Sequence, residues 1–365
     1  MIISLPIVLL YGIFAVSGLF FIWGKRKEPI SVKLPDGVSV IVAVKNESEN
    51  LDRLIDSILK NKITIPYELI IVDDSSKDDS WALLEGWRLK TSKIQIYKNE
   101  GAGKKSAVKM AIEHSKYETI IQTDGDCEVG PFWLLTNVTK LIDSKTKLVI
   151  GPVYPFTSKG ALNGFIRLEW LALQFLTAYT SRLNKPSMVN GANMTFYKTD
   201  YLAFVKSGLG SKYASGDDAF FLKYLAKYKE GSVFNLDQNS VVKTVMPLTF
   251  SGLLKQRIRW ATKAGKTTNF IGSVFSLIVV LANFSWIGAI YGTLDDIHLL
   301  PVLIISVGWK LTTDFIICWN MSMFFKDGKV LRYVPVMFFI YPVYLLFGLV
   351  LSFKKTYSWK GVKMK

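Results

Sequence analysis

The pattern of hydrophobic and polar positions divides the chain into a mixed central part and apolar ends. Residues 2–23 form an uncharged apolar run, and further apolar runs lie near 270–291, 299–325 and 334–353. Each run has about the 20 residues that a helix needs to span a bilayer. We therefore expect one N-terminal and about three C-terminal transmembrane helices.

The central part, from Ser31 to Pro247, alternates short apolar runs with amphipathic segments. VSVIVAV at 38–44 is rich in β-branched residues and predicts a buried strand, whereas 47–60 has the spacing of an amphipathic helix. The alternation continues with strands expected at 68–74, 93–97 and 118–124 and helices expected from about Ser76 and Gly103. Strands that alternate with helices form a mainly parallel sheet, so we predict an α/β fold that binds ligands beyond the carboxyl ends of its strands.

Charges beside the apolar runs predict the orientation of the chain. Lys25, Arg26 and Lys27 directly follow the first run, and basic residues concentrate on the cytoplasmic side of membrane proteins. No basic segment precedes this run and no small-residue cleavage site closes it, so a cleaved signal peptide is disfavoured. We expect a multi-pass membrane protein of the bacterial inner membrane, with its central domain in the cytoplasm.

Two features of the C-terminal runs leave alternatives open. If 334–353 spans the membrane, the basic tail 354–365 lies outside, against the positive-inside rule, unless one run is interfacial or re-entrant. Lys310 and Asp314 lie four residues apart inside a run, and hence on one helix face. Charges inside a membrane are costly and point to function, but we favour a mutually neutralised structural pair.

The composition limits the kinds of molecule that the protein is expected to bind. Half of the 365 residues are hydrophobic and the formal net charge is +16, which favours acidic partners such as lipid head groups or phosphorylated small molecules. The basic clusters flank apolar runs and are not interleaved with aromatic residues on a soluble face, so we expect no nucleic acid. Cys127 lies in a polar loop and Cys318 in an apolar run, so we expect no disulfide framework and a polar domain in a reducing compartment.

Acidic residues lie at three ends of predicted elements. Asp124 and Asp126 flank Gly125 after a strand, where two carboxylates can hold Mg²⁺ or Mn²⁺ and the glycine lets phosphate oxygens approach the backbone. Two further acidic pairs are Asp73 with Asp74, and Asp217 with Asp218. Each site alone also fits a simpler structure, an Asx-rich turn for the triplet and a helix N-cap for either pair.

The order of these motifs, followed by Gln256-Arg257-Ile258-Arg259-Trp260, resembles the membrane-bound family 2 glycosyltransferases of the GT-A fold. That family carries D, DxD, (E/D)D and Q(Q/R)xRW motifs, and the full match at 256–260 is the most specific of them. The resemblance runs from about Val38 to Trp260. It implies a transmembrane helix over 1–24, a Rossmann-like GT-A domain over 31–247, an interfacial helix over 248–266 and a membrane region over 267–365.

The resemblance also implies an inverting transfer of a sugar from a nucleotide diphosphate sugar, with a UDP-sugar as the expected donor. Mg²⁺ or Mn²⁺ at Asp124 and Asp126 would stabilise the leaving diphosphate. Asp218 takes the position of the base that accepts the proton of the acceptor hydroxyl, and Asp217 would orient it or bind the acceptor.

Other site residues follow from the same resemblance. The residues expected to bind the nucleoside are Asn46, Glu47, Asp73 and Asp74. Lys104 matches a position near the diphosphate, although a basic first turn of a helix explains it as well. The expected acceptor side is Gly191, Ala192 and Asn193, where a turn explains the glycine equally.

The basic segment LLKQRIRWATKAG at 253–265 has two interpretations. Its neighbour Phe250 falls on one helical stripe with Leu254, Ile258 and Ala261, which predicts an amphipathic helix at the membrane surface. A surface anchor alone explains the lysines. The resemblance adds that Gln256, Arg257, Arg259 and Trp260 contact the nucleotide diphosphate and the acceptor, and we expect both roles.

Three functions remain after these steps. The first is transfer of a sugar to a membrane lipid at the cytoplasmic face, and the second is a processive polysaccharide synthase that also translocates its glycan. The third is a catalytically inactive membrane scaffold, against which the retention of every acidic motif argues. The single N-terminal apolar run and the short chain favour the first function.

Overall fold

The computed structural model describes residues 4–24, 33–158, 160–213, 216–247, 249–352, 357–359 and 362–364, without the side chains of 261–265, 349–352 and the last two ranges. The chain divides into two compact units. We call residues 27–156 and 188–245 the sheet unit, and residues 1–26, 157–187 and 246–364 the helical unit. The basic residues 25–27, the tail residues 354–356 and the side chains of Ala261 and Lys263 lie outside the described part.

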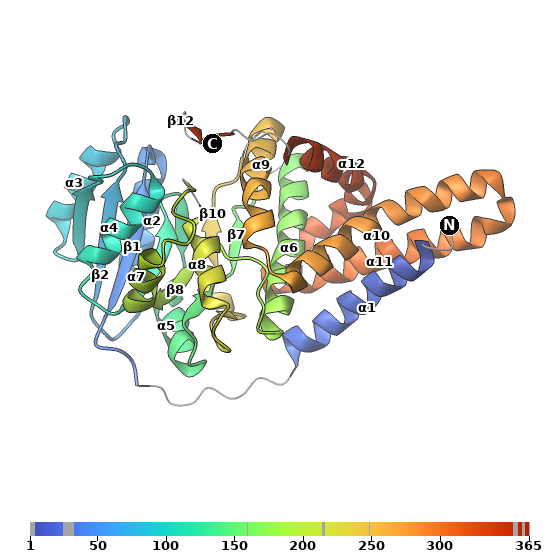
Figure 1. The fold of residues 1–365 in the computed structure, drawn as a ribbon. Helices are drawn as coiled ribbons and strands as arrows, with labels where there is room; N and C mark the ends of the chain where they lie inside the picture. Colours follow the sequence, from blue (N-terminus) through green and yellow to red (C-terminus); the bar gives the residue numbers. More distant parts are fainter. Residues whose placement is uncertain are drawn as a thin grey trace. The chain divides into compact units, whose positions relative to one another are not determined.

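The sheet unit is built on seven strands in the order β3-β2-β1-β4-β8-β6-β9 (Figure 1). The strands are β1 (Val38–Val44), β2 (Tyr67–Asp73), β3 (Ile94–Lys98), β4 (Thr119–Asp124), β6 (Leu148–Ile150), β8 (Met194–Tyr197) and β9 (Val233–Phe234). The first four are parallel, and β8 runs antiparallel to both β4 and β6. The predicted α/β fold with a mainly parallel sheet is therefore confirmed. A smaller sheet joins β5 (Cys127–Val129), β10 (Val242–Thr244) and β7 (Val153–Pro155).

The sheet unit also contains several helices. They are α2 (Ser48–Leu59), α3 (Ser80–Lys90), α4 (Lys104–His114), α5 (Trp133–Asp143), α7 (Lys198–Lys206) and α8 (Asp217–Leu225), with a short 3-10 turn, η1 (Gln238–Ser240). Helix α2 buries Leu51, Leu54, Ile55 and Ile58, which share one face at helical spacing. The helix expected from Ser76 begins only at Ser80, because Ser76 and Lys77 are engaged in loop hydrogen bonds with Asp73 and Asn46.

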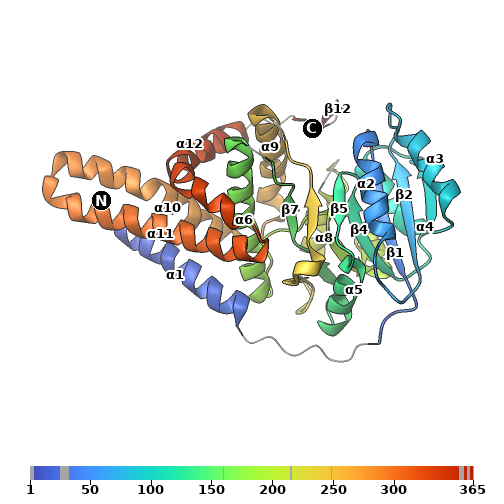
Figure 2. The ribbon, with the colours of Figure 1, turned by 180° about the vertical axis from the view of Figure 1, so that it is seen from behind.

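The helical unit contains the apolar runs. Its elements are α1 (Ser4–Trp23), α6 (Ala161–Arg182), α9 (Phe250–Thr267), α10 (Phe270–Asp295), η2 (Ile297–Leu299), α11 (Leu300–Phe324), η3 (Gly328–Tyr333), α12 (Val334–Ser352), β11 (Tyr357–Trp359) and β12 (Val362–Met364). Four stretches within them are long and apolar enough to cross a membrane: Leu5–Trp23, Phe270–Asp295, Ile297–Phe324 and Gly328–Gly348. Figures 1 and 2 both show α10 and α11 side by side as a hairpin. The predicted set of one N-terminal and three C-terminal apolar helices is confirmed.

Helix α6 packs in the helical unit and interrupts the domain predicted over 31–247. Fourteen of its 22 residues are buried, and it contacts α1 and α11. Its buried charges, Arg167 and Glu169, pair with Asp327 and Arg257 of the same unit. Helix α6 contains polar residues and so lacks the continuous apolar run of a spanning helix. For this reason the hydrophobic pattern assigned it to the domain of the sheet.

The charges inside the apolar helix α11 are paired. Lys310 Nζ lies 2.6 Å from Asp314 Oδ2, and the hydroxyl of Tyr11 donates to Asp314 Oδ1 at 2.9 Å. Lys310 is only 1% exposed and its ammonium lies 4.6 Å from the ring centroid of Phe338. The predicted pairing is confirmed, and Asp314 also joins α1 to α11.

Candidate active site

Loops after β1 and β2 are fastened to each other at the carboxyl end of the sheet. The backbone N–H of Asn46 donates to Ser76 Oγ at 2.9 Å, and the N–H of Lys77 donates to Asn46 Oδ1 at 2.7 Å. The N–H of Glu47 donates to Ser80 Oγ at 2.9 Å. Asn46 adopts φ 52°, a left-handed conformation that asparagine tolerates better than most residues. These two predicted nucleoside residues therefore lie where the first two parallel strands end.

The buried carboxylates Asp73 and Asp74 organise the same edge. Asp73 accepts from the N–H and the hydroxyl of Ser76, which closes an Asx turn. Asp74 accepts from Lys45 Nζ at 3.1 Å, and its Oδ1 also receives Asn99 Nδ2 and the N–H of Gly103. Helix α3 begins at Ser80 and has no side-chain cap bond, so the N-cap alternative for Asp74 is wrong. Asp74 instead ties together the ends of β1, β3 and the loop before α4.

Lys104 begins α4 and reaches the DxD triplet. Its ammonium lies 2.6 Å from Asp124 Oδ1. Although burial lowers it, the pKa of Lys104 is raised above its ordinary value by Asp124, Asp217 and Asp218. The cation is therefore held in the charged form beside three carboxylates. The alternative that Lys104 is only a basic residue of a first helical turn does not account for this pairing.

Gly125 has a packing role that differs from the expected one. A Cβ atom on it would lie 2.9 Å from Glu47 Cγ and 3.1 Å from Val44 Cγ1. The glycine thus lets the triplet pack against the loop after β1. The expectation that Gly125 lets phosphate oxygens approach the backbone stays a prediction.

The triplet has the chemistry of a divalent cation site. Burial, with Asp124 and Glu47, raises the pKa of Asp126 to about 6 against the opposing charge of Lys104. Among the described residues no group of three or more His, Cys, Asp or Glu could hold a metal ion by itself. Mg²⁺ is often bound by one or two carboxylates together with substrate phosphates, so Asp124 and Asp126 fit this mode.

A second group of predicted residues meets at Gly191. Its N–H donates to Asp218 Oδ2 at 3.1 Å. A Cβ atom on Gly191 would lie 3.0 Å from Gln122 Nε2, 3.5 Å from Lys104 Nζ and 3.6 Å from Asp218 Oδ2. Because Lys104 also bonds Asp124, the structure brings the predicted base, the predicted phosphate lysine and the DxD triplet to one place in the sheet unit.

Gln122 is a site residue that the sequence analysis missed. It is 1% exposed, and neither polar atom of its amide has a hydrogen-bond partner among the described residues. A buried amide without hydrogen bonds is energetically costly, so a ligand or an ordered water is expected to bind Gln122 when the protein functions. The available signal was an amide within the buried strand TIIQTD, two residues before Asp124 and hence on the same face.

Asn193 does not face an acceptor site. It is fully buried, and Trp133 Nε1 donates to its Oδ1 at 3.0 Å. Its Nδ2 donates to the carbonyl oxygens of Pro152 and Ser240. With its amide satisfied inside the core, Asn193 joins separate loops of the sheet unit, and its expected contact with the acceptor is corrected to this structural role. Ala192, 2% exposed, is also buried.

Asp217 carries a testable pH dependence. Burial first, and then Asp218, raises its pKa from 3.8 to about 6. The folded state therefore holds this proton more tightly, and the free energy of unfolding falls by up to about 3 kcal/mol as the pH rises from about 4 to 6. We expect Asp217→Asn to remove this fall and to melt higher than wild type near pH 7. Melting curves in detergent across pH 4–7 measure it, with the exposed Asp36→Asn as control; equal slopes in all three proteins would contradict it.

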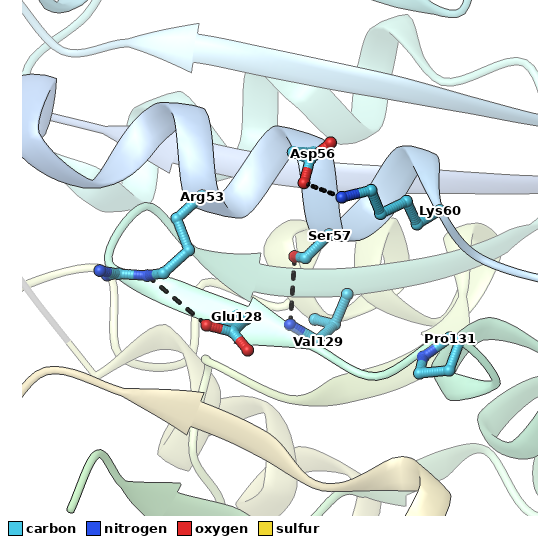
Figure 3. A pocket seen from close by; sticks show the side chains of 7 residues that line it. All are labelled: Arg53, Asp56, Ser57, Lys60, Glu128, Val129 and Pro131. Carbon is cyan, nitrogen blue, oxygen red and sulfur yellow. Dashed lines mark hydrogen bonds and ion pairs between the residues drawn. The ribbon is translucent and has the colours of Figure 1, made fainter.

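A hollow of about 450 Å³ lies apart from these residues, along α2 and β5. Figure 3 shows that its charged side chains face one another: Asp56 with Lys60 at 2.5 Å, and Arg53 with Glu128 at 4.0 Å. The hydroxyl of Ser57 accepts from the N–H of Val129. None of the predicted site residues lines this hollow. Arg53 also donates to the carbonyl oxygen of Asp126, so α2 contacts the DxD triplet through this side chain.

The motif at 256–260 belongs to the helical unit. Arg257 pairs with Glu169 of α6 at 2.5 Å, and its guanidinium carbon lies 4.2 Å from the ring centroid of Trp260. The expected amphipathic helix is present as α9, but its most buried described side chain is Leu253 while Phe250 is 50% exposed. Helix α9 packs on α12 of the same unit, and Leu254 and Ile258 of the predicted stripe are half-buried.

Comparison with known proteins identifies the class. Residues 39–204 match the family model described as Glycosyl transferase family 2. The chain is 24% identical over 224 residues to chondroitin synthase of Pasteurella multocida (strain Pm70), a match that covers 57% of this chain and 22% of that protein. It is 24% identical over 240 residues to poly-beta-1,6-N-acetyl-D-glucosamine synthase of Staphylococcus aureus (strain COL), covering 65% of this chain and 56% of that protein. The chain thus spans less than two thirds of the length of either relative.

A solved structure supports the fold. The mannosyltransferase PcManGT from Pyrobaculum calidifontis, in complex with GDP-Man and Mn²⁺, aligns with a TM-score of 0.57 and 17% identity over 96% of each chain. Residues 39–204 thus resemble family 2 glycosyltransferase domains, and the fold is like that of a GT-A glycosyltransferase. The resemblance found in the sequence and the predicted class of enzyme, a glycosyltransferase, are both confirmed at this level.

Proposed function

We propose that the chain transfers a sugar from a nucleotide diphosphate sugar to a membrane lipid, with inversion at the anomeric carbon. The observation that carries the proposal is the meeting of Lys104, Asp124 and Asp218 around Gly191. A positive group and a carboxylate pair suit a diphosphate and its metal, and a separate carboxylate suits the acceptor hydroxyl. These are the two requirements of the reaction.

On the donor side, Lys104 offers a fixed positive charge to the diphosphate as it leaves. A divalent cation at Asp124 and Asp126, Mg²⁺ or Mn²⁺, would supply further stabilisation of that charge. Asp74 and Asp73 shape the loop at which the nucleoside would bind, and Gln122 has an amide available for a hydroxyl of the sugar. We propose a UDP-sugar as the donor, and the GDP-Man in the mannosyltransferase structure makes GDP-sugars the alternative to test.

On the acceptor side, Asp218 is the proposed base. One oxygen accepts from Gly191 and the other from the N–H of Ala219, so the carboxylate is held in one orientation. Asp217 is its neighbour in the chain, and burial together with the charge of Asp218 raises the pKa of Asp217 to about 6. A positioned base of this kind contributes about 10²–10⁴-fold to the rate of proton transfer.

A lipid acceptor is favoured by the membrane-spanning helices, and a cytoplasmic site is favoured by the charge pattern of the sequence. The second candidate is a polysaccharide synthase, because both curated relatives are named as synthases of polymers. The two functions share the donor site and differ in the acceptor.

The first experiment identifies the donor. Purified protein in lipid is incubated with Mn²⁺ or Mg²⁺ and a panel of UDP- and GDP-sugars, and released nucleoside diphosphate is measured. We expect turnover with one UDP-sugar above the others. Turnover with a GDP-sugar alone would overturn the choice of nucleotide, and no turnover with any donor and lipid extract would argue against the proposed function.

Gly191→Ala tests the meeting point. Its Cβ would lie 3.0 Å from Gln122 Nε2 and would crowd Lys104 and Asp218, so we expect kcat/KM to fall about tenfold. Gly86→Ala is the matched control, because nothing lies within 4 Å of that Cβ and alanine favours the helix α3. Equal activity of both variants would place the reaction away from Gly191.

A further inference from the structure

Arg257, the second residue of the 256–260 motif, forms hydrogen bonds with several side chains of the helical unit. Arg257 Nε lies 3.1 Å from both carboxylate oxygens of Glu169, and Nη2 lies 2.5 Å from Oε2. Tyr344 of α12 accepts from Arg257 Nε and donates to Glu169 Oε1, each at 3.1 Å. One ion pair therefore joins α9 to both α6 and α12. We call Arg257, Glu169 and Tyr344 the clasp.

The clasp is buried. The side chains of Arg257 and Glu169 are 10% and 6% exposed, and Tyr344 is 6% exposed. A planar guanidinium that meets a carboxylate with two nitrogens is fixed in orientation as well as in charge. Three of its five N–H groups donate to Glu169, Tyr344 and Gln256, and the buried carboxylate of Glu169 neutralises its charge. A neutralised arginine attracts a diphosphate less strongly, which differs from the role that the sequence predicted for Arg257.

The remaining contacts of Arg257 lead to its neighbours in the motif. Nη1 donates to Gln256 Oε1 at 2.9 Å, and the guanidinium carbon lies 4.2 Å from the ring centroid of Trp260. Trp260 also packs on Trp170 of α6, with 5.6 Å between ring centroids. The guanidinium therefore sets the orientation of both the amide and the indole through direct contacts.

We propose that Arg257 and Glu169 are positioning residues that fix the orientation of Gln256 and Trp260 within the helical unit, and that Arg257 does not bind the donor diphosphate. The inference rests on the proposed function for what Gln256 and Trp260 do, but the clasp itself is a property of the helical unit. Because the two charges are buried together, removal of either one alone leaves the other unpaired, whereas removal of both does not.

The experiment is a double-mutant cycle with Arg257→Gln, Glu169→Gln and the double variant in detergent or lipid. We expect each single variant to raise the acceptor KM about tenfold and the double variant to recover much of that loss, because coupled residues are not additive. The donor KM and the affinity for UDP and GDP, measured by calorimetry, are expected to stay within about twofold of wild type. Arg257→Lys keeps the charge and is expected to fall between wild type and Arg257→Gln.

Asp327→Asn is the matched control. It breaks the other buried ion pair of α6, with Arg167, two residues from Glu169. This variant is expected to lower the melting temperature without the change in acceptor KM, which separates positioning from loss of stability. If Arg257→Gln alone weakens nucleotide binding tenfold or more and Glu169→Gln does not, Arg257 binds the diphosphate and the proposal is overturned. The proposal is also overturned if the loss of melting temperature in the double variant equals the sum of the two single losses. This readout needs no activity. It therefore separates failure of the clasp from failure of the proposed function.

Discussion

Asp218→Asn is expected to lower kcat by about 10²–10⁴-fold, the contribution of a general base, with little change in the affinity for the nucleotide. The substitution keeps the shape of the side chain and can keep the bond from the N–H of Gly191, but it removes the oxygen charge that accepts the proton. Initial rates of sugar transfer at saturating donor measure the effect.

Asp36→Asn is the control for this result, because Asp36 is an exposed residue of the same unit. It is expected to be as active as wild type. A melting curve and a nucleotide titration show whether Asp218→Asn is folded and binds donor. If the folded variant keeps its full rate, Asp218 is not the base, and Asp217→Asn becomes the variant to compare.

Asp124→Asn is expected to lower kcat/KM by about 10²–10³-fold, as loss of one charge-stabilising group does in other active sites. The substitution removes the carboxylate that pairs with Lys104 and one of the two that would hold the cation. Chelation of divalent ions is expected to abolish the activity of wild type, and Mn²⁺ or Mg²⁺ to restore it. The metal concentration for half-maximal activity is expected to rise in the variant.

Rates measured before and after dialysis against a chelator check the metal directly. Full activity of the dialysed wild type would contradict the role given to Asp124 and Asp126. An Asp124→Asn variant with an unchanged rate and an unchanged metal titration would contradict the position of the donor site. It would also contradict the proposed role of Lys104 in binding the diphosphate.

The sequence predicted the sheet well, because buried parallel strands are short apolar runs with β-branched residues and polar ends. VSVIVAV at 38–44 and the DxD triplet after β4 are of this kind. It did not predict the place of α6, whose charges Arg167 and Glu169 look like those of a soluble helix until their partners are known. Those partners lie 160 and 88 residues away in sequence, beyond what a local pattern records.

For the site, spacing suggested Asp124, and the resemblance to the family selected Lys104 and Asp218; their roles stay predictions. The sequence could not show that Gly191 joins Asp218 to Lys104, since this contact depends on β8 lying beside β4 in antiparallel register. The sequence also could not show that Asn193 and Gly191 have different roles. The amide of Asn193 is hydrogen-bonded inside the core, whereas Gly191, two residues earlier, contacts Asp218. Arg257 shows the same limit, because a motif identifies a residue and not the group that its side chain contacts.

The most direct measurement of the central claim uses purified protein in liposomes with a donor labelled in the sugar. The label is followed into an organic extract and into an aqueous precipitate, with Asp218→Asn alongside. The account predicts that label enters the organic extract in a metal-dependent way with wild type and that this signal is lost in the variant. Label found only as an aqueous polymer would make the chain a polysaccharide synthase, and no transfer from any nucleotide sugar would contradict the claim that this chain moves a sugar at all.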